Sequence, residues 1–338
     1  MQYMDVTFRE TTNVDGLHPS ETHVLETLKR LKHSGIDYVE PSYIQPPKNG
    51  VFSLRDYNEE FIARVAALFE GTRTKIATML LPDGFNPGLY SDVFFQSVDM
   101  VRLGCNRWEI KQTAKPIDYF KKNGLQVAVS LIRSSQYSAD ECANAMLEAE
   151  GNGTDIFYLA DTNGTMLPED VRRRISELRR RTDILLGFHP HDNMGFAEAN
   201  SLEAMNCGAE FLDGSLLGFG KGAGNARTEK MFVLFERLKK EGYDSKALIP
   251  AMRYFFENVY SALPAQAVFT EQYKFILYAL HGVTLATDKK LKELARVHGL
   301  DELDLAAKLV FQFSGDFDAL QSSFNVESDD QSLPITTQ

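Results

Sequence analysis

The sequence predicts an α/β fold, a closed (β/α)8 barrel of the TIM type, followed by a helical extension. Up to about residue 242, short β-rich apolar runs alternate with amphipathic helical stretches, a pattern typical of parallel strands joined by helices. Eight such strand-helix units follow one another without interruption, which is the pattern of a barrel. An open, doubly wound sheet is the alternative, but it does not usually need eight consecutive units.

The elements follow from local patterns in chain order. The predicted strands are the apolar runs DVTFRE, DYVEPSYI, KIATMLL, DMVRLG, LQVAVSLIR, DIFYLADT, DILLGFHPH and EFLDGSLLG. The helices between them have apolar residues at helical spacing, and the first has Ser20 as a candidate N-cap and Gly35 beyond its end. These helices are expected at residues 20–34, 59–70, 89–96, 116–122, 139–150, 168–181, 196–207 and 227–240.

The pattern changes after the barrel. Residues 1–242 are expected to form the catalytic barrel, and residues 243–325 show helical patterns such as TDKKLKELARVHGL without strands between them. The polar segment 326–338 is expected to be disordered.

Composition excludes some classes of partner. The 36 Lys and Arg against 47 Asp and Glu give a net charge of -11, which argues against nucleic acid or an anionic membrane surface. The three cysteines are widely spaced, as expected for reduced thiols in the cytoplasm. No run of about 18 apolar residues is present, so we expect a cytoplasmic protein without membrane spans.

The stretch LGFHPHDNMG contains His189 and His191 at the end of an apolar run. In a strand, residues two apart lie on one face, so the two imidazoles point together. Neutral imidazoles in this arrangement can chelate a divalent cation. Two hydrogen-bonded histidines at a strand end are the alternative interpretation.

Other polar residues also lie at the ends of predicted strands. Catalytic groups of such barrels come from the carboxyl ends of the strands. Carboxylates and imidazoles on these apolar runs indicate a metal site, with an ionic network in the barrel core as the alternative. The polar residues at predicted strand ends are Arg9, Glu10, Glu40, Asp161, Thr162, Asn163, His189, His191, Asp213 and Ser215.

Four motifs together resemble a known family, the metal-dependent barrel lyases and condensing enzymes that include 4-hydroxy-2-oxovalerate aldolase, hydroxymethylglutaryl-CoA lyase and isopropylmalate synthase. DVTFRE resembles the family's D-x-T-x-R-D opening, and GIDYVE is similar to its second-strand motif. ADTNGTMLP resembles D-T-x-G-x-x-x-P. HPHDNMGFAEAN, followed by DGSLLGFGKGAGNARTE, resembles H-x-H-x-N-x-G and the glycine-rich loop after the eighth strand. In order, the motifs span about the first 240 residues.

The resemblance implies roles for individual residues. Arg9 is expected to stabilise an enolate, and Glu10, His189 and His191 are expected to bind the metal. Asn225 matches an asparagine that completes or supports the metal sphere in several members, and a loop-capping amide is the alternative. Barrels often bind anions in the loops after strands 7 and 8, so Lys221 is a candidate for a substrate anion. The expected substrate contacts are Glu40, Asp161, Thr162, Asp213 and Lys221.

The chemistry of the implied reaction requires such a set. Breaking a carbon-carbon bond beside a 2-oxo group leaves negative charge on an enolate oxygen, which a divalent cation and a fixed guanidinium stabilise. Two nitrogen ligands and one carboxylate leave open positions for a bidentate substrate. Mn2+ or Mg2+ suits the remaining oxygen ligands, and Zn2+ is an alternative.

The sequence departs from the family at two positions. Glu10 stands where the family has Asp, so its carboxylate is one methylene longer. Asn13 stands where the pyruvate aldolases have a histidine base, and an amide cannot accept a proton at neutral pH. The candidate replacement bases are His18, Tyr278 and His281, with His18 ranked first.

The leading interpretation is a metal-dependent aldolase acting on a 4-hydroxy-2-oxo acid through a pyruvate-type enolate. The helical extension resembles the region through which those aldolases associate with an aldehyde dehydrogenase, and a homo-oligomer is the other expected assembly. One alternative is a Claisen-type enzyme that condenses an acyl-CoA with a 2-oxo acid, with His281 or His298 as its further catalytic histidine. Another is a non-catalytic or regulatory relative, which Asn13 favours.

Overall fold

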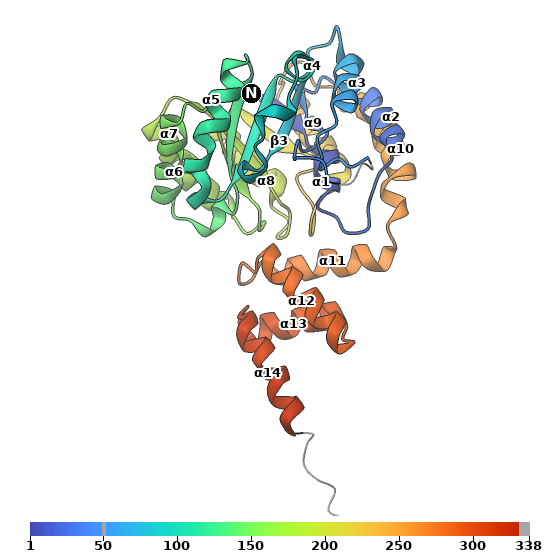
Figure 1. Ribbon diagram of the computed structural model, residues 1–338, viewed down its shortest axis with the longest axis vertical. Helices are drawn as coiled ribbons and strands as arrows, with labels where there is room; N and C mark the ends of the chain where they lie inside the picture. Colours follow the sequence, from blue (N-terminus) through green and yellow to red (C-terminus); the bar gives the residue numbers. More distant parts are fainter. Residues whose placement is uncertain (49–51, 331–338) are drawn as a thin grey trace, which may run out of the picture. The chain divides into compact units, whose positions relative to one another are not determined.

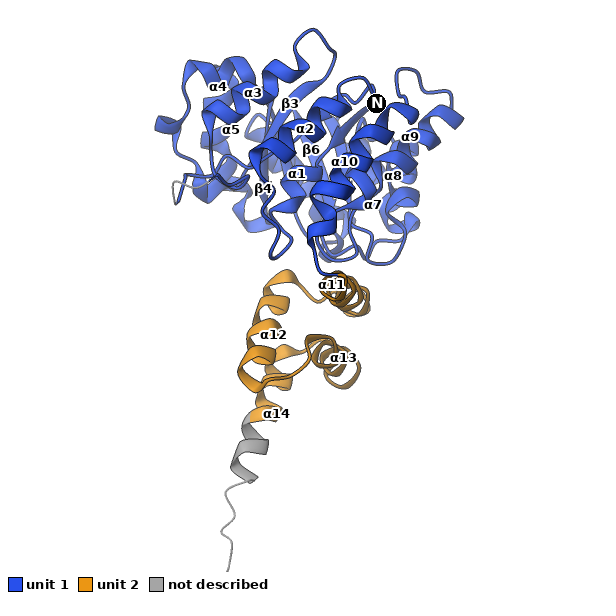
Figure 2. Cartoon of the chain, turned by 90° about the vertical axis from the view of Figure 1, so that its right-hand side faces the viewer, with its two compact units in different colours: residues 1–264 blue, residues 265–338 orange. Residues whose placement is uncertain are grey.

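The chain forms two compact units, Met1–Pro264 and Ala265–Gln338, in the computed structural model, which describes residues 1–48 and 52–330 (Figure 2). Each unit has its own apolar core. The units are therefore described one at a time.

The first unit is a closed barrel of eight parallel strands, which confirms the predicted fold class (Figure 1). Each strand pairs with the next in sequence, and β8 closes the barrel by pairing with β1, with Gln2 opposite Phe211 and Asp5 opposite Gly214. The strands are β1 (Gln2–Asp5), β2 (Tyr38–Val39), β3 (Lys75–Leu80), β4 (Met100–Cys105), β5 (Gln126–Leu131), β6 (Ile156–Asp161), β7 (Leu185–Pro190) and β8 (Phe211–Gly214).

The eight predicted helices are present, seven of them between consecutive strands and the last after β8. The capping signals are used as expected, because the Ser20 side chain accepts a hydrogen bond from the backbone N–H of His23. A short helix and a tenth helix add to the eight. The helices of this unit are α1 (Thr7–Thr11), α2 (Glu21–Leu31), α3 (Glu59–Phe69), α4 (Asp92–Ser97), α5 (Ala114–Lys122), α6 (Ala139–Gly151), α7 (Pro168–Arg181), α8 (Ala197–Asn206), α9 (Thr228–Arg237) and α10 (Ile249–Asn258).

The first strand is shorter than the sequence predicts. β1 ends at Asp5, and Arg9 and Glu10 lie on helix α1 instead of the strand. The Asp5 carboxylate accepts hydrogen bonds from the Thr7 N–H at 3.1 Å and the Thr7 hydroxyl at 2.9 Å, which turns the chain after the strand. The Thr7 hydroxyl in turn accepts the Leu216 N–H at 2.8 Å. This turn replaces the predicted strand end with a buried helical turn.

The second strand is also shorter than predicted. Only Tyr38 and Val39 of the run DYVEPSYI form β2, because Pro41 has no N–H to donate to a ladder. Tyr43 then makes a single parallel bridge with Met79. Glu40 therefore stands directly after the strand, in a buried position.

The barrel unit extends beyond the boundary predicted at residue 242. Helix α10 belongs to it, because the Phe255 ring packs edge-on against Phe8 at 5.8 Å and against Phe219 at 5.3 Å between centroids. Phe255 is completely buried. Apolar contacts with residues distant in sequence thus place the boundary at residue 264.

The second unit is helical, as predicted. Its helices pack around Leu291, Leu309 and Leu320, which are completely buried. Helix α14 continues to Asp330, so the segment predicted to be disordered begins inside a helix, and residues 331–338 lie outside the described residues. Within the described ranges, no helix is both long and apolar enough to cross a membrane. The four helices are α11 (Ala265–Tyr278), α12 (Leu285–His298), α13 (Glu302–Phe313) and α14 (Phe317–Asp330).

Candidate metal centre

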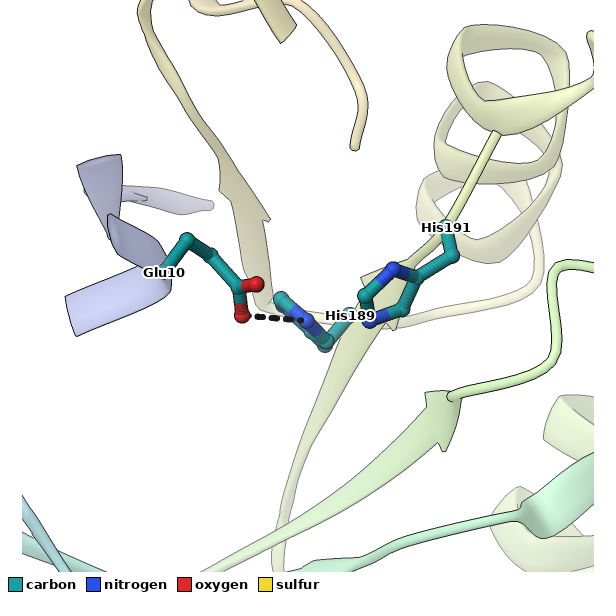
Figure 3. Close-up of side chains that lie close together, drawn as sticks. All are labelled: Glu10, His189 and His191. Atoms are coloured by element: carbon teal, nitrogen blue, oxygen red, sulfur yellow. Dashed lines mark ion pairs between the residues drawn. The ribbon is translucent and has the colours of Figure 1, made fainter. Parts of the chain in front are cut away.

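Three side chains meet at the carboxyl ends of the strands: Glu10 from α1, His189 from the end of β7 and His191 just beyond it (Figure 3). One ligand atom from each lies within 4.8 Å of the other two. The side chains are almost completely buried, with exposed fractions of 0%, 4% and 8%. The trio that the sequence suggested is therefore assembled in space, and metal binding by it stays a prediction.

The two imidazoles are oriented by the strand and by their neighbours. Their ring centroids are 5.2 Å apart and the ring planes are nearly perpendicular, at 85°. Nε2 of His189 lies 3.6 Å from the Glu10 carboxylate, while Nδ1 of the same ring lies 3.0 Å from Asp213. The Nε2 side of His189 thus faces the centre, and the Nδ1 side faces the barrel interior.

Both histidines are held in the neutral form. Burial lowers the pKa of His189 well below its ordinary value, and the nearby cations Arg9 and Arg102 lower it further. Burial lowers the pKa of His191 in the same direction, with His189 and Arg9 contributing. A neutral imidazole has a free lone pair, which is the form that binds metal.

Asn225 adds a fourth polar group. It forms an antiparallel bridge with His191 and is 1% exposed. Its Nδ2 donates to the Phe219 carbonyl at 3.4 Å, whereas its Oδ1 is buried without a hydrogen-bond partner among the described residues. A buried, unsatisfied oxygen is costly unless something else binds it. This orphan oxygen, with two imidazoles and a carboxylate, fits a divalent cation.

Gly220 leaves the space in which Asn225 and Glu10 come close. A Cβ atom at Gly220 would lie 2.6 Å from Asn225 Nδ2 and 3.2 Å from Glu10 Oε2. Both contacts are with side chains, so a methyl group would displace the amide before it moved the backbone. The glycine-rich loop thus has a packing requirement at this position.

We expect Gly220→Ala to weaken divalent-metal binding by ~10-fold or more, in the range typical for loss of groups that support metal ligands. The displaced Asn225 amide would no longer present its oxygen to the centre. Isothermal titration with Mn2+ measures the effect. The matched control is Gly151→Ala at the end of α6, where an added Cβ meets no atom within 4 Å. Equal affinity in both variants would show that the loop does not support the centre.

Arg9 lies beside the trio. Its Nε donates to Glu40 Oε2 at 2.8 Å, and its Nη1 pairs with Glu10. Its Nη2 is buried and has no hydrogen-bond partner within the described ranges. Arg9 therefore keeps one buried donor that the rest of the described protein does not use.

Arg102 is a residue that the sequence interpretation missed. It lies in the middle of β4, is completely buried, and pairs with Asp213 at 2.7 Å and with Glu40 at 3.5 Å. Glu40 and Asp213, expected as substrate contacts, thus have arginine partners behind the trio. The signal was a lone arginine in the apolar run DMVRLG, since a buried charge needs a partner.

The position expected for the base holds Asn13, whose side-chain amide contacts two charged side chains. Asn13 Nδ2 lies 3.5 Å from Glu10 Oε2, and its Oδ1 accepts from Arg55 at 3.5 Å. His18 is exposed in the segment that follows α1. Of the three candidate bases, His18 is therefore the one that belongs to the barrel unit.

The other two candidates lie in the helical unit. The Tyr278 hydroxyl is buried and donates to Asp288 at 3.1 Å, and burial raises its pKa far above its ordinary value. His281 is exposed in the turn after α11. Tyr278 thus has a structural partner in its own unit, and the catalytic role of either residue stays a prediction.

Two of the remaining predicted substrate contacts, Asp161 and Thr162, accept hydrogen bonds from backbone N–H groups of nearby loops. Asp161 accepts backbone N–H groups of Thr165 at 3.2 Å and Met166 at 2.9 Å. Thr162 accepts the Arg133 N–H at 2.9 Å, and Lys221 is a largely buried residue of the glycine-rich loop. Asp161 and Thr162 therefore have local structural partners, and contact of these two residues or Lys221 with a substrate stays a prediction.

Comparisons with known proteins agree with this architecture. Residues 91–253 match the HMGL-like family model. The chain is 39% identical to oxaloacetate decarboxylase of Mycobacterium tuberculosis over 41% of its length and 42% of that protein. It is 33% identical to 4-hydroxy-2-oxovalerate aldolase of Thermomicrobium roseum, over 62% of the chain and 61% of the relative. It is 29% identical to the 4-hydroxy-2-oxovalerate aldolase of Roseiflexus castenholzii, over 89% of the chain and 96% of the relative.

The alignments with the first two relatives thus span less than two thirds of their lengths, while the third spans nearly the whole protein. Among solved structures, the carboxyl transferase domain of Rhizobium etli pyruvate carboxylase superimposes with a TM-score of 0.69 at 17% identity, covering 89% of this chain and 53% of that one. That similarity supports the fold alone. The chain is therefore similar to the HMGL-like family model over residues 91–253, and over most of its length it is similar to 4-hydroxy-2-oxovalerate aldolases.

Proposed function

We propose that this protein is a divalent-metal-dependent carbon-carbon lyase that cleaves a 4-hydroxy-2-oxo acid and releases a pyruvate-type product. The observation on which this proposal depends is the buried Glu10, His189 and His191 trio with the unused Arg9 donor beside it. The names of the similar proteins, aldolase and oxaloacetate decarboxylase, support a lyase.

The donor set favours a particular kind of cofactor. Two imidazole nitrogens, one carboxylate and the Asn225 oxygen suit Mn2+ or Mg2+, and Zn2+ is the alternative. When bound, such a cation would act as a Lewis acid toward the carboxylate and carbonyl of a 2-oxo acid.

The side chains of the protein would supply the remaining functions. Arg9 would donate its Nη2 hydrogen bond to the oxygen on which charge develops. His18 would accept the proton of the 4-hydroxyl group, because imidazole is a side chain that can take up and release a proton near neutrality. The C3–C4 bond would then break, with its electron pair passing to C3 and the 2-oxo oxygen as an aldehyde leaves. A proton from water at C3 completes the pyruvate-type product.

The other predicted residues have more distant roles in this proposal. Lys221 would bind a substrate anion at the glycine-rich loop. We propose that Glu40 and Asp213 hold Arg9 and Arg102 in place, instead of contacting the substrate directly as the sequence suggested. Tyr278 and His281 remain secondary candidates for the base.

Asn13 favours a second candidate function, decarboxylation of a 2-oxo acid with a carboxylate on C3. In that reaction CO2 leaves, its bonding electrons pass to C3, and no base has to remove a proton from the substrate. An amide at the position of the usual base is therefore no obstacle. The similarity to a protein named oxaloacetate decarboxylase points the same way.

One screen separates these functions. Purified protein loaded with Mn2+, Mg2+ or Zn2+ is assayed for pyruvate release from a series of 4-hydroxy-2-oxo acids and from oxaloacetate. A parallel arm adds acyl-CoA to 2-oxo acids and follows release of free CoA, the product of a Claisen condensation. Metal-dependent release of pyruvate from a 4-hydroxy-2-oxo acid supports the aldolase, and its release from oxaloacetate alone supports the decarboxylase. Release of free CoA supports the condensing alternative, and inactivity throughout supports a non-catalytic relative.

The variant His18→Ala distinguishes the first two lyase reactions. It should lose aldol cleavage and keep any decarboxylation, since only the former needs a base. His33→Ala is the matched control, because His33 is also exposed and lies in the turn after α2. Unchanged aldol cleavage in His18→Ala would remove His18 from the mechanism.

The helical unit is the proposed site of association with a second copy of the chain or with an aldehyde dehydrogenase. Four large apolar side chains on one face of α11 and the turn after it are between 44% and 64% exposed: Phe269, Tyr273, Ile276 and Leu280. Their spacing of three to four residues is that of a single helix face. Light scattering of the purified chain, with and without a dehydrogenase, tests both forms of association.

A further inference from the structure

Arg102 is placed behind the proposed metal ligand His189 by a chain of two short contacts. Its Nη1 donates to Asp213 Oδ2 at 2.7 Å, and the same oxygen lies 3.0 Å from His189 Nδ1. The guanidinium also lies over the Tyr158 ring, 4.2 Å from its centroid. Arg102, Asp213 and Tyr158 are completely buried, so water does not replace any of these contacts.

This arrangement determines which nitrogen of His189 has a lone pair available to bind a metal. A carboxylate only accepts hydrogen bonds, so Nδ1 must be the protonated nitrogen that donates to Asp213. The lone pair is then on Nε2, which lies 3.6 Å from Glu10 and faces the proposed centre. Groups that orient a metal-binding histidine in this way commonly change metal affinity when they are removed.

We propose that Arg102 is a positioning residue, which fixes an acceptor oxygen at the Oδ2 site of residue 213 and thereby keeps the His189 lone pair on Nε2. The proposal rests on the proposed metal-dependent function. Its physical basis is that a charge-assisted hydrogen bond from a guanidinium is stronger than one from a neutral imidazole. Arg102 therefore decides which end of the residue-213 side chain occupies the shared site.

In Asp213→Asn, the orientation of the new amide should depend on Arg102. A carboxylate has two equivalent oxygens, but an amide has one oxygen and one NH2 group, so its orientation matters. With Arg102 present, the amide oxygen should occupy the shared site and still accept from His189 Nδ1. With Arg102 replaced by Met, nothing prevents the NH2 group from turning toward Nδ1, which would move the imidazole proton to Nε2.

The experiment compares wild type, Asp213→Asn, Asp213→Asn/Arg102→Met and Asp213→Asn/Arg102→Lys. The tautomer of His189 is read from ¹⁵N chemical shifts in the metal-free proteins, and Mn2+ affinity is measured by calorimetry. We expect the Nδ1–H tautomer in wild type, Asp213→Asn and the Lys variant, whose ammonium still donates to the amide oxygen. The Met variant should populate the Nε2–H form and bind Mn2+ ~10- to 100-fold more weakly than Asp213→Asn.

Two results would overturn the proposal. One is a reversed tautomer in Asp213→Asn alone, because the Asp213 charge would then set the ring without help from Arg102. The other is the same tautomer and affinity in the Met variant as in Asp213→Asn. If the Met variant does not fold by circular dichroism, the wild type and Asp213→Asn still decide, since either one with Nε2–H contradicts the proposal. Absence of Mn2+ binding in wild type would refute the proposed function, whereas the tautomer measurement is independent of metal.

Discussion

Replacing His189 or His191 with alanine is expected to abolish retention of a divalent metal while the barrel remains folded. Each imidazole supplies one of three ligand atoms that lie within 4.8 Å of one another. Loss of one nitrogen leaves two protein ligands beside the Asn225 oxygen, and two ligands with one amide oxygen seldom hold a labile divalent cation against water. The side-chain contacts of His189 are with the carboxylates of Glu10 and Asp213, and His191 forms a backbone bridge with Asn225, so the cost to folding should be moderate.

Metal content after dialysis, measured by mass spectrometry of the purified variants, tests this expectation. Circular dichroism reports whether the barrel is intact. His33→Ala serves as the control, because it also removes an imidazole but lies on the outer side of the barrel, in the turn after α2. Full metal content in both His189→Ala and His191→Ala would falsify the site.

The second large effect is expected for Arg9→Ala, which should reduce turnover by ~100- to 1,000-fold, the range typical for removing one donor to a developing oxyanion. The reason is the orientation of the guanidinium. Glu40 and Glu10 hold its Nε and Nη1, while its buried Nη2 has no partner in the described part of the chain. That donor would act on charge that appears during the reaction, so its loss should lower the rate more than it changes binding of the substrate.

The measurement must separate this effect from changes in the centre itself, because Arg9 also pairs with Glu10. Turnover of the substrate identified in the screen is therefore compared at matched metal content. Arg64→Ala is the control, since Arg64 is an exposed arginine on α3 that pairs with Glu21. A decrease of less than tenfold would remove Arg9 from the proposed chemistry.

Local patterns in the sequence were sufficient for most of the architecture. Strands such as LQVAVSLIR and helices such as residues 168–181 follow from the period of their apolar residues, which depends only on neighbours in the chain. The pairing of His189 and His191 follows from the same rule, because alternate residues of a strand share a face. The family motifs then connected Glu10 with these histidines, although it lies on a different element.

The details that decide the site come from contacts between distant parts of the chain. β1 ends at Asp5 because the Asp5 carboxylate accepts from Thr7 and from Thr228, 223 residues further on. α10 belongs to the barrel because Phe255 packs on Phe8, and no local pattern marks that contact. The end of β1, and with it the placement of Arg9 and Glu10 on a helix, is therefore a consequence of barrel closure.

Arg102 shows why the charge pairs of the site could not be predicted from the sequence. In the sequence it is one arginine in an apolar run, and its charge could belong equally to an exposed strand end. Closing the barrel removes it from water, and a buried guanidinium must then find carboxylates. It finds Glu40 directly after β2 and Asp213 in β8, two residues that no spacing rule connects to β4. The sequence by itself determined the barrel and the proposed ligands, whereas burial in the closed barrel decided which charges pair behind them and which nitrogen of His189 faces the centre.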